Sequence, residues 1–382
     1  MADTPPRHAQ EPSFFRTLGD DVRQTWSELR RTGLKESIGR TFADLQAFYL
    51  STEHIDRLAG MGRVKRWLYL TLWLLKSLFL KLTPTRRVLL VLAFVFLSTG
   101  LGWVSYGENV RVDIRLPSVG IVLLLVILML ELKDKLLAHE ELEAGRAVQH
   151  ALMPDRSPEV PGWDVWLYTQ SANEVGGDLV DYLRLDATRV GITLGDVAGK
   201  GLPAALLMAK LQATLRALTT EVDSLAELGS RVNRILHRDG LPNRFATLVY
   251  LEVNSDSGHV RVLNAGHMPP LLLRGAGFAE MPRGSFALGL LKDVTFTEQH
   301  VELNPSDLLI VYSDGLTEAM DASGDFFGEE RLRALVPSLA RDPAEQVGGR
   351  LLAAVEAFVG DAPRHDDLSL VVLKRRGDRS AT

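Results

Sequence analysis

Residues 189–208, RVGITLGDVAGKGLPAALLM, predict a β-strand, a glycine-rich turn and a helix in immediate succession. The apolar and β-branched residues from Arg189 to Leu194 favour a strand, and Pro203 suits the first turn of the helix that follows. Asp196 lies between the two elements, where neighbouring glycines let the backbone approach closely. The stretch therefore places an acidic side chain at the end of a strand.

Three further acids have similar surroundings: Asp178 in EVGGDLVD, Asp314 in YSDGLTEA and Asp366 in RHDDLSL. Each lies beside an apolar, strand-like segment, where a buried carboxylate is costly unless positive charge meets it. No matching set of Lys or Arg accompanies the four acids. Divalent cations such as Mg²⁺ or Mn²⁺ would meet this need, because they prefer oxygen ligands.

Two such ions about 4 Å apart can share a carboxylate and a bridging water that attacks a phosphate. The backbone carbonyl of Val197 could serve as a further ligand. Singly, each motif is weak, since an Asp-Gly pair is usually a turn. The segment GDVAGKG is not a nucleotide-binding loop, because Gly201 stands where that motif needs Ser or Thr.

The surrounding sequence predicts an α+β domain over residues 154–376. Strands are expected at 164–169, 245–253, 260–264, 308–312 and 368–373, which are rich in β-branched and aromatic residues. Helices are expected from Pro203 to about residue 218, from the capping box of Ser224 and Glu227 to about residue 237, and over 343–358.

The first part of the chain predicts a membrane anchor. Residues 1–62 form a helical segment of unknown role, and residues 63–135 form a membrane region with an interfacial helix at 66–82 and spans at 88–106 and 116–132. The first span has no charged residue over 19 positions, close to the roughly 20 needed to cross a bilayer. Basic residues at the outer flanks of this hairpin, Arg86 with Arg87 and Lys133 with Lys135, predict a multi-pass protein with its catalytic domain in the cytoplasm. A linker helix over 131–153 would join the hairpin to the catalytic domain.

The amino-acid composition excludes several kinds of site and partner. Hydrophobic residues make up 46% of the 382 residues and charged residues 24%, which is typical of a globular protein. The absence of cysteine excludes disulfides, thiolate zinc sites and cysteine nucleophiles. The net charge of −5, with no basic stripe, predicts that nucleic acid is not a partner.

Six segments occur in an order that resembles one known family. They are NEVGGDLVDY, LGDVAGKGLPAALLMA, RFATLVYLEV, NAGHMPPLLLR, LIVYSDGLTEAMD and HDDLSLVVL. From about Glu140 to Lys374 the chain resembles the SpoIIE/RsbU branch of the metal-dependent PPM (protein phosphatase 2C-like) serine phosphatases. The resemblance implies an α-β-β-α sandwich.

The resemblance also implies a site. Asp178, Asp196, Asp314 and Asp366 match the metal aspartates of the family, and Val197 matches its carbonyl ligand. Asp367 ranks second to Asp366. His267 stands where eukaryotic relatives often have an aspartate linked to a third metal, and Lys200 is a candidate for the phosphate-binding cation by position only, with loop packing an equal alternative.

The implied function is hydrolysis of phosphoserine or phosphothreonine with two Mn²⁺ or Mg²⁺ ions. By resemblance, the substrate is a phosphorylated STAS-domain anti-sigma factor antagonist, the location is the bacterial inner membrane, and the linker helix mediates a homodimer. Two alternatives stay open. One is a membrane-tethered pseudophosphatase that only binds a partner, and the other is a different metallohydrolase such as a nuclease.

Overall fold

The computed structural model describes residues 62–98, 103–104, 114–239, 244–275 and 277–377. The chain divides into two compact units, Met1–Asp134 and Lys135–Thr382. The predicted helical segment at residues 1–62 lies outside the described residues except for Gly62.

The first unit contains a helical hairpin. Its described elements are α4 (Arg63–Lys81), α5 (Pro84–Ser98), the two-residue strands β1 (Trp103–Val104) and β2 (Ile114–Arg115), and the beginning of α6 (Leu116–Leu152). Helices α5 and α6 approach closely where both have small residues: Ala93 is fully buried, and a methyl group on Gly120 would lie 2.8 Å from the carbonyl oxygen of Ala93. Arg86, near the beginning of α5, forms ion pairs of 2.7 Å and 2.6 Å with Glu131 and Asp134 of α6.

The prediction of two membrane spans is wrong. Within the ranges that the structure describes, no helix combines the length and the apolar character needed to cross a membrane. The described part of the predicted span at 88–106 corresponds to α5, which has 15 residues, whereas a span needs about 20. Residues 99–102 and 105–106 of this prediction lie outside the described residues. The predicted span at 116–132 is the start of the 37-residue helix α6, which continues into charged sequence, and the interfacial helix at 66–82 corresponds to α4. The predicted multi-pass localisation in the cell membrane is therefore also wrong.

The second unit is built on two antiparallel five-stranded sheets. One has the order β10-β7-β6-β5-β4 and the other β3-β12-β11-β8-β9. The strands of the first sheet are β4 (Leu179–Arg184), β5 (Arg189–Val197), β6 (Ala246–Asn254), β7 (His259–Ala265) and β10 (Glu298–Glu302). Those of the second are β3 (Trp163–Gln170), β8 (Leu271–Arg274), β9 (Gly277–Glu280), β11 (Leu308–Tyr312) and β12 (Leu368–Arg375).

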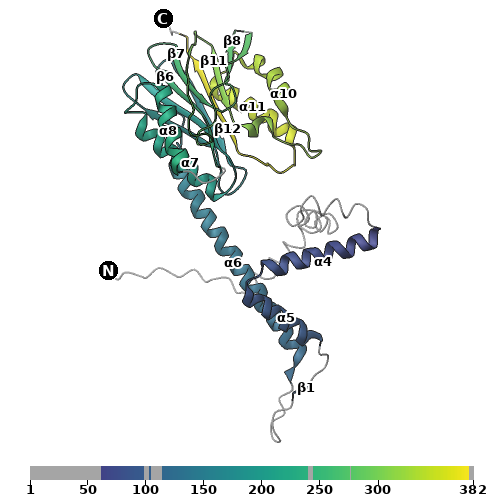
Figure 1. Cartoon of the computed structure of the whole chain (residues 1–382). Coiled ribbons are helices and arrows are strands. Elements are labelled where there is room, and N and C mark those ends of the chain that lie inside the picture. The colour runs from purple at the N-terminus through teal and green to yellow at the C-terminus, as the bar shows by residue number, and fades with distance from the viewer. Residues whose placement is uncertain (1–61, 99–102, 105–113, 240–243, 276, 378–382) are drawn as a thin grey trace, which may run out of the picture. The chain divides into compact units, whose positions relative to one another are not determined.

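Helices cover the outer face of each sheet (Figure 1). Helices α7 (Leu202–Leu218) and α8 (Leu225–Asp239) share one apolar core with the first sheet. Helices α10 (Gly328–Leu335) and α11 (Ala344–Val359), with the 3₁₀ helix η1 (Val336–Leu339), share another with the second sheet. A third core fills the space between the sheets. The predicted α-β-β-α sandwich is therefore confirmed.

Burial on both faces explains the sequence of the inner strands. Strand β5 has a helix layer on one side and the second sheet on the other, so seven of its nine residues are buried and it reads as a continuous apolar run. The predicted strands correspond to β3, β5, β6, β7, β11 and β12, within a few residues at each end. Strands β4, β8, β9 and β10 were not predicted.

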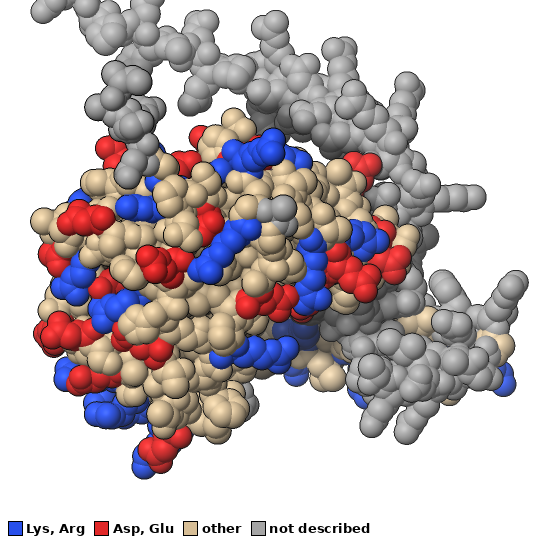
Figure 2. Space-filling view, turned by 90° about the horizontal axis from the view of Figure 1, so that it is seen from above, with Lys and Arg blue, Asp and Glu red and all other residues tan. Residues whose placement is uncertain are grey.

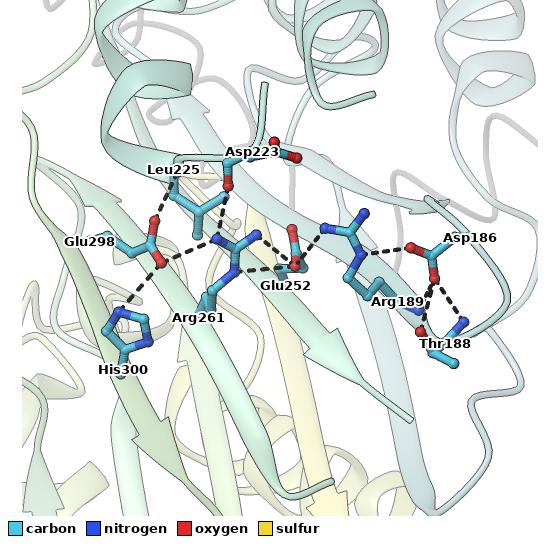
Figure 3. A network of polar contacts seen from close by, with 9 residues as sticks. All are labelled: Asp186, Thr188, Arg189, Asp223, Leu225, Glu252, Arg261, Glu298 and His300. Atoms are coloured by element: carbon cyan, nitrogen blue, oxygen red, sulfur yellow. Dashed lines mark hydrogen bonds and ion pairs between the residues drawn. The ribbon is translucent and has the colours of Figure 1, made fainter. Parts of the chain in front are cut away.

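A row of charged side chains crosses four strands of the first sheet (Figure 3). Glu252 on β6 accepts from Arg189 on β5 and from Arg261 on β7, with N–O distances of 3.3 Å and 2.7 Å. Arg261 also pairs with Glu298 on β10 at 3.2 Å. Glu298 in turn accepts a hydrogen bond from the backbone N–H of Leu225, the first residue of α8. The row therefore attaches the beginning of α8 to the sheet.

The exposed surface mixes both signs of charge. On the face that Figure 2 shows, basic and acidic side chains are interspersed among uncharged ones. Surface ion pairs such as Arg333 with Glu280, at 2.7 Å, are of this kind. Such pairs contribute little to stability individually, about 0–1 kcal/mol.

Candidate active site

Two of the predicted aspartates belong to the first sheet. Asp178 immediately precedes β4, and Asp196 is the next-to-last residue of β5. The two strands are antiparallel neighbours in which Leu179 lies opposite Gly195. The beginning of β4 and the end of β5 therefore bring the two acids to the same edge.

The other two aspartates belong to the second sheet. Asp314 begins the short helix α9 (Asp314–Thr317) after β11, and Asp366 lies two residues before β12. Strands β11 and β12 are also antiparallel neighbours, with Tyr312 opposite Leu370. The charges of Asp314 and Asp366 both raise the pKa of Asp196, whose own charge raises that of Asp178, so the four acids lie near enough to influence one another.

The carboxylates destabilise one another's charged forms. Burial, followed by the charge of Asp196, raises the pKa of Asp178 well above its usual value. Burial raises the pKa of Asp196 to about 7, with Asp314 and Asp366 contributing next. Burial raises the pKa of Asp314 to about 6, with Asp366 contributing next. Burial and like charge at this level are typical of functional sites.

Among the residues that the structure describes, the site has too few cations to balance these acids. Lys200 lies 3.2 Å from Asp366, also bonds to the carbonyl of His365, and lowers the pKa of Asp196 and Asp314. The Oδ2 atom of Asp178 is buried and has no hydrogen-bond partner among the described residues. An all-oxygen set with one unpaired oxygen suits a hard divalent cation.

The acids are not yet a closed ligand set. Within the described residues, no three or more His, Asp or Glu side chains are gathered tightly enough to enclose a metal ion. The charges of Asp314 and Asp366 nevertheless raise the pKa of Asp196, and the charge of Asp366 raises that of Asp314.

Two glycines allow the segments of the site to approach. A methyl group on Gly177 would lie 2.9 Å from the carbonyl oxygen of Val197, so this carbonyl faces the loop that ends at Asp178. A methyl group on Gly315 would lie 2.0 Å from the carbonyl oxygen of Asp367. The glycines beside the acids are therefore sites of close backbone approach, as the sequence predicts.

Asp367 anchors a loop. Its Oδ1 accepts from the N–H of Ala172 at 2.8 Å, and its Oδ2 accepts from the N–H groups of Gly177 and Asp178 at 2.6 Å and 3.4 Å. Both oxygens are thus directed at the loop before Asp178. The adjacent Asp366 has different surroundings, because it lies beside Lys200.

The sequence analysis did not identify Arg244 as a residue of the site. Its guanidinium donates to the carbonyl of Ala198 at 2.8 Å, and it occupies the space where a side chain on Gly199 would lie. Gly199 has a φ of 107°, which favours glycine. Arg244 therefore braces the turn that follows Asp196, and its place directly before the strand FATLVY was the available signal.

His267 connects the two sheets. Its Nε2 lies 3.0 Å from the carbonyl oxygen of Tyr312 on β11, and its Nδ1 lies 2.7 Å from the hydroxyl of Thr247 on β6. Since a carbonyl only accepts, the neutral ring carries its proton on Nε2 and accepts from Thr247 at Nδ1. Burial lowers the pKa of His267 to about 4, so the ring is neutral at pH 7. Both nitrogens are thus engaged within the protein.

Two curated proteins are similar in sequence to this domain. The chain is 28% identical over 220 residues to protein IcfG of Synechocystis, covering 50% of this chain and 35% of that protein. It is 25% identical over 242 residues to the phosphoserine phosphatase RsbU of Bacillus subtilis, covering 62% of this chain and 70% of RsbU. The chain thus spans about a third of the length of IcfG.

Solved structures share the fold. The RsbU and RsbW domains of Rv1364c from Mycobacterium tuberculosis match with a TM-score of 0.51 and 27% identity, covering 59% of this chain and 63% of that one. The SiaA-PP2C domain of Pseudomonas aeruginosa matches with a TM-score of 0.57 and 20% identity, covering 63% of this chain and 98% of that one. The family model of Stage II sporulation protein E (SpoIIE) matches residues 186–376, half of the chain. As the sequence predicts, the chain belongs to the SpoIIE family of PP2C-type phosphatase domains.

Proposed function

We propose that this chain is a metal-dependent phosphatase that removes phosphate from phosphoserine or phosphothreonine on a regulatory protein. The observation that carries the proposal is the convergence of four aspartates, Asp178, Asp196, Asp314 and Asp366, whose mutual repulsion and burial raise the pKa of three of them. Its catalytic domain would comprise residues 154–376.

The four aspartates and the carbonyl of Val197 would hold two Mn²⁺ or Mg²⁺ ions. When bound, these ions supply an acidified water and positive charge for the phosphate oxygens. Lys200, whose side chain is more than half exposed beside Asp366, would meet a phosphate oxygen of the substrate. Hydrolysis breaks the phosphorus–oxygen bond and yields a free hydroxyl and inorganic phosphate.

The regulatory substrate would be a STAS-domain anti-sigma factor antagonist. The relationship to the phosphoserine phosphatase RsbU and to a structure that pairs RsbU and RsbW domains supports this choice. The linker helix, residues 131–153, would join two copies of the chain. Exposed apolar side chains in this part of α6, including Leu136, Leu137 and Val148, support a homodimer.

The test is hydrolysis of p-nitrophenyl phosphate and of a phosphorylated antagonist by the purified full-length chain, with Mn²⁺ and with EDTA. The proposal expects Mn²⁺-dependent turnover that falls at least about 100-fold in Asp314→Asn, since a ligand of the ion that would acidify the attacking water is changed. Asp325→Asn, at an exposed aspartate, should retain full activity. Equal turnover in Asp314→Asn and the unmodified chain would refute the metal role.

One observation favours the alternative of a catalytically inactive binding protein. The described acids do not form a ready-made ligand set. If the unmodified chain binds the phosphorylated antagonist but releases no phosphate at any Mn²⁺ concentration, this alternative replaces the phosphatase. The sequence analysis gave this alternative a membrane tether, which is not supported because the predicted spans are wrong.

A further inference from the structure

The end of helix α6 carries a buried amide that the proposed mechanism does not use. Gln149 is only 6% exposed, although it lies one turn before the helix ends at Leu152. Its Nε2 donates to the carbonyl of Gly176 at 2.8 Å, and its Oε1 accepts from the N–H of Gly176 at 3.0 Å. Only a side chain with both a donor and an acceptor can make this pair.

The peptide that Gln149 holds leads directly to Asp178. The next residue, Gly177, donates to Asp367 at 2.6 Å. A methyl group on Gly176 would lie 2.5 Å from Oδ2 of Asp367, so the glycine loop is packed tightly against that carboxylate. Gln149 and Asp367 thus fix the two residues before Asp178.

The same helix face makes a second contact with the loop. A methyl group on Gly145 would lie 3.7 Å from Val175 and 3.6 Å from Leu202, the first residue of α7. Residues 145 and 149 are four apart and share one face of the helix. The helix end therefore packs along the loop, with Gln149 supplying the two polar contacts to Gly176.

We propose that Gln149 is a positioning residue that sets the metal affinity of the site by fixing the backbone that carries Asp178. The inference rests on the proposed function for its metal. Asp178 is almost fully buried and one of its oxygens lacks a partner among the described residues, so a small displacement of its backbone changes what that oxygen can reach.

The chain offers a matched control. Gln212 on α7 is also buried, and its Nε2 donates to the carbonyl of Leu152 at the same end of α6. Gln212→Met removes a buried hydrogen bond from the helix end without touching the loop before Asp178. Gln149→Met keeps the size of the side chain and removes both contacts to Gly176.

The experiment measures Mn²⁺ binding to the full-length chain by calorimetry and by electron paramagnetic resonance, with thermal unfolding of each variant. Gln149→Met is expected to raise the dissociation constant for Mn²⁺ at least about tenfold, whereas Gln212→Met leaves it within twofold at a similar loss of stability. If Gln149→Met does not fold, Gln149→Asn serves instead, because its amide is one methylene too short to make both bonds.

A second readout is turnover of p-nitrophenyl phosphate as a function of Mn²⁺. Gln149→Met should need more Mn²⁺ for half-maximal turnover and recover to within about threefold of the unmodified chain at saturation. Unchanged Mn²⁺ affinity in both Gln149 variants, or an equal change in Gln212→Met, would overturn the inference. Failure of the unmodified chain to turn over substrate while Gln149→Met still weakens Mn²⁺ binding would refute the phosphatase and leave the positioning role standing.

Discussion

His267 makes the stability of the second unit depend on pH in a way that one substitution can isolate. The ring is buried between Thr247 and the carbonyl of Tyr312, and burial lowers its pKa to about 4. An unfolded chain has a histidine pKa of about 6.5. As the pH falls below 6.5, the unfolded state therefore binds a proton that the folded state does not, and stability is lost until the folded ring protonates near pH 4.

The size of this effect follows from the two pKa values. A difference of about 2.5 units corresponds to about 3 kcal/mol when the full interval has been crossed, of which about 2 kcal/mol is lost between pH 8 and pH 5. Glutamine at position 267 cannot ionise and can still donate to the carbonyl of Tyr312. His267→Gln should thus be less stable than the unmodified chain at pH 8, by about 1 kcal/mol for the lost contact with Thr247, and should lose about 2 kcal/mol less on going to pH 5.

The assay is urea unfolding of the full-length chain in EDTA at pH 5, 6, 7 and 8, followed by tryptophan fluorescence. The raised pKa values of Asp178, Asp196 and Asp314 act in the opposite direction, but they are common to both proteins and cancel in the difference. His259→Gln, at an exposed histidine, should follow the unmodified chain. Parallel curves for His267→Gln and the unmodified chain would refute the assignment of a neutral buried ring.

Three further substitutions have definite expected outcomes. Gly315→Ala places a methyl group 2.0 Å from the carbonyl oxygen of Asp367, so it should cost about 1–3 kcal/mol in urea unfolding and reduce Mn²⁺-dependent turnover. Gly145→Ala meets nothing closer than 3.6 Å inside a helix, so it should raise stability by up to about 1 kcal/mol without changing turnover, and a fall in melting temperature would contradict the packing described. Glu252→Gln removes the charge at the centre of the row in Figure 3 and should cost about 1–2 kcal/mol with unchanged Mn²⁺ affinity, whereas Glu302→Gln, at an exposed site, should have no measurable effect.

Strands and helices of the layered fold could be predicted where their buried residues form a continuous or periodic apolar pattern in the sequence. Strand β11 is buried at all five residues and was predicted with its observed ends, and the helix beginning near Pro203 ends at Leu218 as expected. Strand β10, EQHVE, has one buried residue of five because it lies at the edge of its sheet. Because its side chains are mostly charged or polar, the strand cannot be predicted from apolar runs.

The membrane prediction failed because an apolar run does not fix where a helix ends. The uncharged run from 88 to 106 predicts one span, but its described part belongs to the 15-residue helix α5, and residues 99–102 and 105–106 lie outside the described residues. The second run, 116–132, and the predicted linker helix, 131–153, together cover the 37-residue helix α6.

The acids of the candidate site could be predicted, whereas the groups that hold them could not. Asp178 and Asp314 occur in short motifs that are visible along the chain. Gln149 and Gly176 are 27 residues apart, and His267 and Tyr312 are 45 apart, so their contacts exist only after folding. A glutamine on a helix is ordinarily exposed, and sequence alone gave no reason to place this one inside.

These holding contacts follow from the electrostatics of the site. Four carboxylates at one end of a sandwich repel one another, so attraction among them cannot keep their segments in place. Instead, hydrogen bonds to the backbone hold each segment: Gln149 and Asp367 before Asp178, Arg244 after Asp196, and His267 before Asp314. A change in these groups should alter metal affinity, whereas a change in the charge row of Figure 3, which attaches α8 to the sheet, should alter stability alone.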